Sequence, residues 1–341
     1  MNTPVYNSFP EKNAAFRENY KIETKEALDS FISTHLGNNN YLYRGINTAT
    51  YKLYSSSQVQ WMLTDAIKKN YDANAYYDFI KKSIELVRNN KCVQKYINSI
   101  NNSNNDIYIL ALMQHFGMPS PMLDFSHSIL SSLFFACDNC DMTLTTSQDH
   151  LSDYVSLYVI SRNIDWVRYS IQDVMKDGAN RLNEMLKENT HFAAGVVDTK
   201  DVEREFLTLP YEKFKDFSFV AVNDNPTTSM AINIPVLKFS CEYQIINDRI
   251  ISQQGMFIAN NKVDSPLVEL MNDCCDENYF ICYNIHKKLL DYLKAEYLDK
   301  HGINTLSVYC TGEQSVQNLQ KEFGQLKSEV LSWLDKMREQ N

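Results

Sequence analysis

Segments with the period of an amphipathic helix alternate irregularly with short apolar segments of strand character, and this alternation limits the folds open to the chain. Helical patterns recur along the chain, at residues 22–36, in several stretches between 58 and 100, at 106–116, after Ser126, at 247–254 and at 286–300. Strand-like segments lie between them, at residues 41–46, 155–160, 239–246, 255–259, 279–285 and 305–309. Helices and strands mixed in this order predict an α+β fold with a mixed sheet, several peripheral helices and a long C-terminal helix.

The length and composition fit one large globular domain. The chain has 341 residues, of which 44% are hydrophobic and 22% charged, and no segment approaches the roughly 18 consecutive apolar residues of a membrane helix. Residues 1–16 lack the apolar stretch of a secretory signal. We therefore expect a cytoplasmic protein without a membrane segment, in which residues 1–20 are loose or strapped over the surface.

The net charge and the cysteines exclude further classes of protein. A net charge of −9 argues against extensive nucleic-acid binding, because phosphate backbones need clustered cations. Eight cysteines are too few for a disulfide scaffold of this length. Cys137 and Cys140 form a C-x-x-C pair, but Cys137 also continues an apolar helical face. We therefore expect reduced thiols and no metal site.

The first of three short motifs places an arginine at the end of an apolar strand. In YLYRG (41–45), Arg44 stands beside Gly45, one of only nine glycines in the chain. A buried guanidinium without a partner is unfavourable, so Arg44 must meet a carboxylate, a cluster of carbonyls or a ligand anion. Two interpretations stay open: a structural ion pair, such as one with Asp124, and a contact with a ligand phosphate or ribose.

The second motif is QHFGMPSPMLDFS, residues 114–126. A helix ends at its glycine, a proline-stiffened loop follows, and Asp124 arrives just before another helix. Ser126 or Ser128 can cap that helix, whose N-terminal amides can bind an anion. In the structural alternatives Asp124 itself occupies the positive helix end, and His115 is stabilised by the C-terminal dipole of its own helix.

The third motif is RIISQQGMF, residues 249–257. Arg249 and Gln253 are four residues apart and share a helix face. The structural alternative is that Gln253 ties backbone groups together in the core. The signatures of Rossmann domains, P-loop NTPases, zinc proteases and α/β-hydrolases are absent from the sequence, which weakens those interpretations.

Together these segments resemble the FRG-domain family, which is named for its Phe/Tyr-Arg-Gly motif. The segments that carry the resemblance are YRG (43–45), QHFGMPSPMLDFS (114–126) with LFFA (133–136), RIISQQGMF (249–257) and KKLLDYLKAEYLDKHGINTLSVY (287–309). Each motif alone is weak, but four in the family's order are fairly specific. The resemblance implies one FRG-type domain over residues 1–341, with a motif-bearing core at 25–140 and 236–325 and an insertion at about 141–235.

A weaker similarity connects the chain to ADP-ribosyltransferases. It consists of a strand-borne Arg-Gly, a Ser/Thr segment leading into an apolar-Phe-Ala helix, and a late polar motif. The similarity implies that Arg44 holds the dinucleotide, that Ser126 orients Arg44, and that a late acid stabilises the cationic sugar. Gln253 occupies the late position here, so Asp124 or Glu242 would supply the missing charge. The chain also departs from the FRG pattern. Ser-Pro stands where Thr-Arg usually follows the loop proline.

The leading hypothesis is an FRG-type domain that binds a nucleotide or NAD, as in a bacterial-type, ADP-ribosyltransferase-like effector. The candidate catalytic residues, which we expect to converge in space, are Arg44, His115, Asp124, Ser126 and Gln253. The candidate cofactor-binding residues are Arg44, Gly45, Ser126 and Arg249. Whether the protein is an enzyme stays open. The alternatives are a non-enzymatic sensing or protein-interaction module whose motif residues form a polar structural core, and phosphodiester or glycan chemistry on Asp124 with His115.

A long C-terminal helix is predicted over residues 313–337. Its apolar residues alternate steps of three and four in a coiled-coil-like seam, formed by Val316, Leu319, Phe323, Leu326, Val330, Trp333 and Met337. Leu334 widens the seam, and Gly324 beside it weakens an isolated helix by about 1 kcal/mol. The seam should therefore be buried, either on its own domain or against a protein partner or a second copy of the chain.

Overall fold

The computed structural model describes most of the chain. The described residues are 3–63, 73–99, 106–145, 150–161, 211, 219–223, 229–234, 237–242, 248–274, 280–311 and 314–339. The expected insertion at about 141–235 lies largely outside these residues, so its role stays a prediction.

A mixed sheet of nine strands runs through the described residues in the order β1-β9-β4-β2-β3-β8-β5-β6-β7. β1 and β9 are parallel, and the other neighbouring strands are antiparallel. The strands are β1 (Glu18–Ile22), β2 (Tyr41–Ile46), β3 (Met122–Ser126), β4 (Tyr154–Ser161), β5 (Phe219–Asn223), β6 (Ser229–Ile234), β7 (Leu237–Glu242), β8 (Gly255–Asn260) and β9 (Phe280–His286). The predicted α+β class with a mixed sheet is confirmed.

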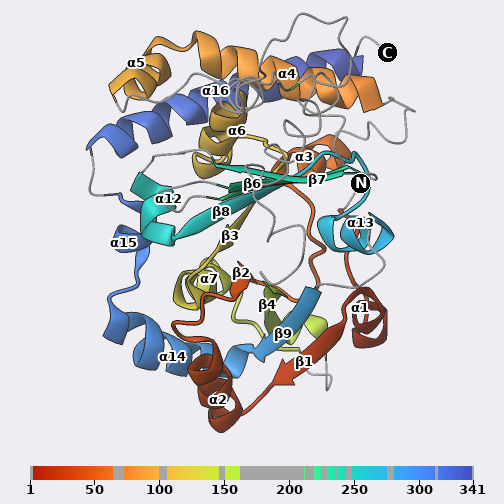
Figure 1. Ribbon diagram of the computed structural model, residues 1–341, viewed down its shortest axis with the longest axis vertical. Coiled ribbons are helices and arrows are strands. Elements are labelled where there is room, and N and C mark those ends of the chain that lie inside the picture. The colour runs from red at the N-terminus through yellow and green to blue at the C-terminus, as the bar shows by residue number, and fades with distance from the viewer. Residues whose placement is uncertain are drawn as a thin grey trace, which may run out of the picture.

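Helices lie on both sides of this sheet (Figure 1). Their bounds are α1 (Phe9–Ala15), α2 (Lys25–His35), α3 (Ser56–Leu63), α4 (Ala73–Asn89), α5 (Lys91–Ser99), α6 (Asp106–His115), α7 (Ile129–Cys137), α12 (Asp248–Gln253), α13 (Leu267–Cys274), α14 (Leu290–Leu293), α15 (Thr305–Tyr309) and α16 (Gln314–Glu339). A π-helical turn, Lys294–Leu298, continues α14. Most helices and strands expected from periodicity therefore form where the pattern places them.

Two local predictions are wrong, and one open alternative is decided. Residues 305–309 form the helix α15 and no strand, because Asn304 and Ser307 build a reciprocal capping box that starts a helix there. The segment expected to be a loop before Asp124 is the strand β3, which pairs over its whole length with β8. Of the two alternatives for residues 1–20, the loose one does not hold for the described residues 3–20, which contain α1, capped by Ser8, and the start of β1.

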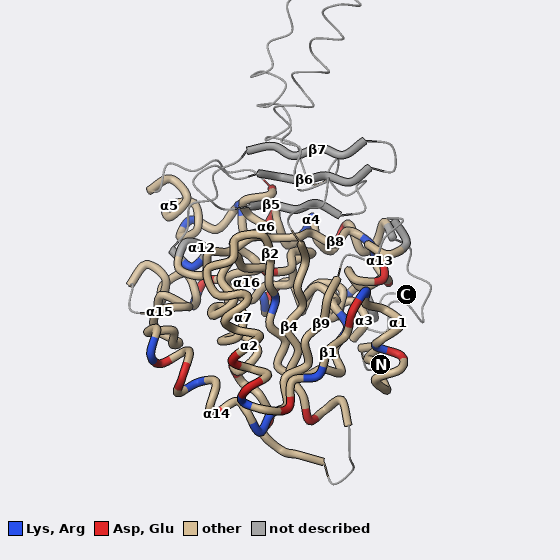
Figure 2. Tube along the Cα trace, turned by 60° about the horizontal axis from the view of Figure 1, so that its bottom comes forward, with Lys and Arg blue, Asp and Glu red and all other residues tan. Residues whose placement is uncertain are grey.

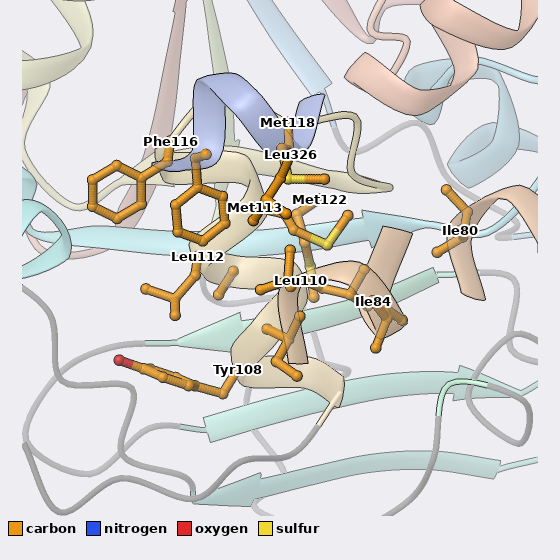
Figure 3. Close-up of a cluster of buried hydrophobic side chains, with 14 of the residues drawn as sticks. Ile80, Ile84, Tyr108, Leu110, Leu112, Met113, Phe116, Met118, Met122 and Leu326 are labelled. Carbon is orange, nitrogen blue, oxygen red and sulfur yellow. The ribbon is translucent and has the colours of Figure 1, made fainter. Parts of the chain in front are cut away.

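Buried apolar side chains form three clusters that hold the helices on the sheet. The first joins α3–α6 and α16 to β3 and β8, and Figure 3 shows part of it, with Phe116, Met122 and Leu326 pointing into one apolar interior. The second lies against α1 and α13, and the third against α2, α7 and α14. Met122 belongs to the first cluster and Leu123 to the second. Because successive strand residues point to opposite faces, the sheet is the central layer.

The sheet is weakest between β2 and β3. These two strands pair at a single position, Tyr43 opposite Ser126, whereas β2 pairs with β4 at six positions and β3 with β8 at five. The sheet therefore consists of two well-paired halves that meet at one contact, and it opens immediately beside that contact.

The C-terminal helix α16 packs within its own chain. It lies beside α4 and α5 (Figure 1), and its seam joins the first apolar cluster. The fully buried seam residues are Val316, Leu319, Phe323, Leu326, Val330 and Leu334. Trp333 is only half-buried, so Leu334 completes the buried face in its place. The expected burial of the seam is confirmed, and pairing with another chain stays a prediction.

The outer helices carry charged residues of both signs. Figure 2 shows Lys and Arg interspersed with Asp and Glu around α2 and α14, as on an ordinary solvated helix face. Among the described residues, no helix has the length and apolar character needed to cross a membrane.

Candidate functional site

A cavity of about 280 Å³ opens where β2 and β3 part. We call it the Arg44 cavity. Its wall comes from five elements and the loops next to them, and it is lined by Tyr43, Arg44, Gly45, Ile46, Asn47, Tyr51, Asp124, Phe125, Ser126, Ser132, Phe135, Asp138, Asn139, Gln253 and Tyr309. Four of the five expected catalytic residues line this cavity, and His115 lies just behind Asp124. The expected convergence in space is therefore observed, while the roles of these residues stay predictions.

Arg44 reaches across the gap between the two strands. Its Nη1 donates to the carbonyl oxygen of Asp124 at 2.6 Å and lies 3.6 Å from the Asp124 carboxylate. In a continued antiparallel register Gly45 would oppose Asp124, but the strands diverge there. The guanidinium therefore satisfies a backbone carbonyl that the strand ladder leaves open.

Asp124 is held from its other side by the end of α6. Gln114 Nε2 donates to Asp124 Oδ2 at 2.7 Å, and His115 Nε2 lies 3.8 Å from Oδ1. The His115 side chain is 3% exposed and packs against the Phe257 ring at 4.9 Å between centroids. The carboxylate is thus fixed between a permanent cation, an amide donor and an imidazole.

Two buried polar atoms in this group have no hydrogen-bond partner within the described chain. They are Arg44 Nε, a donor, and Asp124 Oδ1, an acceptor. Burial lowers the pKa of Arg44, and the nearby Asp124 carboxylate opposes that shift. Arginine nevertheless keeps its proton at any physiological pH. A charged pair in the cavity wall therefore keeps one unsatisfied donor and one unsatisfied acceptor.

Ser126 has different partners from those expected. Its hydroxyl donates to the carbonyl oxygen of Gln253 at 2.5 Å and accepts from the Ser128 amide at 2.8 Å, so it joins β3 to α12 and does not contact Arg44. The N-cap of α7 is Ser128, whose hydroxyl accepts from the Ser131 amide. Of the two capping candidates, Ser126 is therefore excluded. Its two hydrogen bonds hold the end of β3 in place.

Gln253 also has partners within the protein. Its side chain is buried, and Nε2 donates to the carbonyl oxygen of Val308 at 3.1 Å. This contact ties α12 to α15 and matches the structural alternative for this residue. Glu242, the other candidate for a charge at this site, lies in β7, the last strand of the sheet and four places from β3.

Gly45 is explained by close packing. A Cβ atom at this position would lie 1.8 Å from the carbonyl oxygen of Ser132 in α7. Ser132 Oγ also donates to the Tyr43 carbonyl at 3.0 Å. The glycine of the Tyr-Arg-Gly motif therefore lets α7 approach β2, and this contact places Arg44 beside the opening of the sheet.

Arg249 does not line the Arg44 cavity. Its guanidinium donates to the carbonyl oxygens of Tyr309 and His115 and to Gln320 Oε1, and it stacks on the Phe116 ring at 4.6 Å. It lies in the wall of a second hollow, of about 630 Å³. The structure therefore does not bring Arg249 together with Arg44, because its guanidinium binds groups of α6, α15 and α16, and its role in cofactor binding stays a prediction.

Several residues of the site were missed by the sequence patterns. Gln114 stands next to His115 in the second motif, so its place could have been inferred. Tyr309 donates to Asp138 Oδ2 at 2.7 Å, and burial together with that carboxylate raises the pKa of Tyr309. Asn47 donates to the carbonyls of residues 138 and 139. No local pattern marks Tyr309 and Asn47, because they reach the cavity from separate segments, the end of α15 and the loop after β2.

The described residues contain no group of three or more His, Cys, Asp or Glu side chains that could hold a metal ion. Cys137 and Cys140 are both free thiols. Burial raises the pKa of Cys137 to about 12 and also raises the pKa of Cys140.

Residues 39–143 match the family model of the FRG domain. No curated protein and no solved structure matches the chain. The matched segment runs from the start of β2 to just beyond α7, and so includes Arg44, Gly45, His115, Asp124 and Ser126. The resemblance to the FRG-domain family is confirmed over this segment, and the chain therefore carries an FRG domain.

Proposed function

We propose that the FRG domain binds a nucleotide or NAD in the Arg44 cavity. The observation that carries this proposal is the pair of unsatisfied buried atoms, Arg44 Nε and Asp124 Oδ1, at the wall of the cavity. Buried polar atoms nearly always have a partner in folded proteins. An unsatisfied donor and an unsatisfied acceptor on two residues that line one cavity therefore support a ligand that both accepts and donates.

A ribosyl group supplies this combination, because each hydroxyl can donate to Asp124 and accept from Arg44. The fixed positive charge of Arg44 would attract the attached phosphate. Three aromatic side chains, those of Tyr51, Phe135 and Tyr309, also line the cavity and could stack on a base. These three kinds of contact together favour a nucleotide over a sugar or a free phosphate.

The volume limits how much of the ligand is enclosed. A cavity of about 280 Å³ is at the lower end of the usual range for small-molecule sites. We expect the ribosyl and one neighbouring group to be enclosed, with the rest of a dinucleotide lying along the opening.

An ADP-ribosyl transfer is the finer form of this proposal. Such a reaction breaks the bond between the nicotinamide nitrogen and ribose, joins an acceptor oxygen to the same ribose carbon, and releases nicotinamide and a proton. Asp124 is the carboxylate that could stabilise the cationic sugar, since Gln253 is occupied by Val308. The alternative, a non-enzymatic module with a polar structural core, is favoured by the protein partners of Ser126 and Gln253.

The binding proposal is tested with Arg44→Gln and a matched control, Arg17→Gln. The Arg17 side chain is 63% exposed, so its loss should leave binding unchanged. Loss of a hydrogen bond from a charged group should lower the affinity of the Arg44 variant about 10- to 100-fold. NAD, ADP-ribose, AMP and adenosine are titrated by calorimetry, and circular dichroism checks the fold of each variant.

Equal affinities of the two variants, or no binding of any probe by the wild-type chain, would contradict the proposal. A large drop in melting temperature for Arg44→Gln without ligand binding by the wild type would support the structural alternative. Transfer chemistry is tested by nicotinamide release from NAD, which Asp124→Asn should abolish if the carboxylate acts on the sugar.

A further inference from the structure

A second hollow lies at the end of α6 and shares Tyr309 with the Arg44 cavity. We define it as the Arg249 groove, of about 630 Å³, bordered by the end of α6, by the loop after α15 and by the first turns of α16. We propose that this groove binds a phosphate-bearing small molecule. The inference does not depend on ligand binding in the Arg44 cavity.

The charge in the groove wall carries the proposal. Arg249 is 6% exposed, and its hydrogen-bond acceptors among the described residues are all neutral: two backbone carbonyls and the amide oxygen of Gln320. Among the described residues, no carboxylate lies within ion-pair distance of it, and the described groove lining contains no Asp or Glu. In a chain of net charge −9, a buried cation without a countercharge at a cavity favours an anionic ligand.

The two carbonyl contacts of Arg249 also have a structural role and compensate part of its charge. His115 and Tyr309 are the last residues of α6 and α15, so Arg249 also caps two helix ends. A helix C-terminus carries about half a negative charge, and α15 is too short for a full dipole. This compensation is partial, and the first turns of the 26-residue helix α16 border the same groove.

The other polar groups of the groove suit an anion with several acceptor oxygens. The amides of Gln317 and Gln320 and the hydroxyl of Thr311 are exposed in it. Arginine has five N–H donors, and Arg249 uses three in the contacts above. A phosphate can accept from several of these donors at once. The volume of the groove exceeds that of a phosphate ion alone. Its polar rim favours a phosphate that carries a further polar group.

The two hollows share Tyr309 as a wall. His115 also touches both, because its carbonyl accepts from Arg249 and its ring faces Asp124. A ligand in the Arg249 groove would therefore contact Tyr309 and His115, which border or support the Arg44 cavity, without entering that cavity.

The test uses the full chain and a single charge change. Gln317 is exposed, and its side chain makes one surface contact, to the Thr311 carbonyl. Gln317→Glu places a negative charge in the groove, at a helix start where a carboxylate favours folding. The matched control is Gln325→Glu, an exposed position on the same helix about 12 Å further along. Gln317→Lys is the converse variant.

Binding of inorganic phosphate and of ribose 5-phosphate is measured by calorimetry and thermal shift, against chloride at equal ionic strength. We expect Gln317→Glu to weaken phosphate binding about tenfold or more, Gln317→Lys to strengthen it, and Gln325→Glu to leave it unchanged. Tighter binding of ribose 5-phosphate than of inorganic phosphate identifies an organic phosphate as the ligand, and equal binding identifies the free ion.

Two results would overturn the inference. One is no phosphate-specific stabilisation of the wild-type chain at millimolar concentration. The other is an equal loss for Gln317→Glu and Gln325→Glu, which would show a general effect of charge. Arg44→Gln separates this site from the other, because it should leave phosphate binding in the groove intact.

Discussion

Gly45 shows how a single residue places the candidate site. Its backbone is in an ordinary strand, and the constraint on it is space, since α7 lies directly against it. Arg44 precedes Gly45 in the same strand, so the contact between β2 and α7 also fixes where the Arg44 side chain leaves the strand. The motif glycine and the motif arginine thus act together, one by having no side chain and one by its long side chain.

Gly45→Ala should destabilise the protein strongly. The added Cβ would meet the Ser132 carbonyl at 1.8 Å, and α7 would have to move, at a cost of about 1–3 kcal/mol or more. Gly324→Ala is the control, because nothing lies within 4 Å of the new atom, and alanine should stabilise α16 by about 1 kcal/mol. Urea unfolding of both variants measures the difference. Equal stabilities would show that α7 is not confined by β2.

The short helix α1 is fixed to the sheet by one buried lysine. Lys12 Nζ donates to the carbonyl oxygen of Ala49, to Ser156 Oγ and to Asn284 Oδ1, at 2.7–2.9 Å. Burial lowers the pKa of Lys12. The three acceptors offset the loss of hydration, so a segment that reads as polar and loose becomes part of the core.

Lys12→Met should lower the free energy of unfolding by about 1–3 kcal/mol, because buried acceptors lose their donor. The same change at the exposed Lys327 should stay within about 0.5 kcal/mol. The unfolded chain holds the Lys12 proton more tightly than the folded chain does. The wild type should therefore gain stability relative to Lys12→Met as the pH rises from the lowered folded pKa toward about 10.4. Chemical unfolding at several alkaline pH values measures this, and a difference independent of pH would contradict the lowered pKa of Lys12 in the folded protein.

Across the whole molecule, the C-terminal helix closes the largest apolar cluster. Phe323 of α16 stacks on Phe116 of α6 at 4.9 Å between centroids, and α16 also packs on α4 and α5. Segments about 200 residues apart in the sequence thus share one interior. Arg249 and Phe116 link that interior to the second hollow.

Removal of residues 314–341 should expose the faces of α4 and α5 and cause aggregation. The milder variant Phe323→Ala should cost about 3–5 kcal/mol, while Lys321→Ala on the exposed face of the same helix should have little effect. Light scattering measures aggregation, and thermal melting measures stability. A monodisperse truncated protein with an unchanged melting temperature would show that the helix is dispensable.

Periodicity and polarity along the sequence predicted the α+β class, the strand that bears Arg44 and the buried seam of α16, while three short motifs and the FRG resemblance predicted which residues gather at the cavity. These features depend on local pattern, which the sequence states directly. The tertiary structure alone decided that β3 is a strand, because its hydrogen-bond partners lie on β8, far along the chain. It also decided that β2 and β3 part beside Tyr43, and that Ser126, Gln253 and Arg249 face partners other than Arg44. Strand register and helix docking join distant segments, and no local pattern encodes which of them meet.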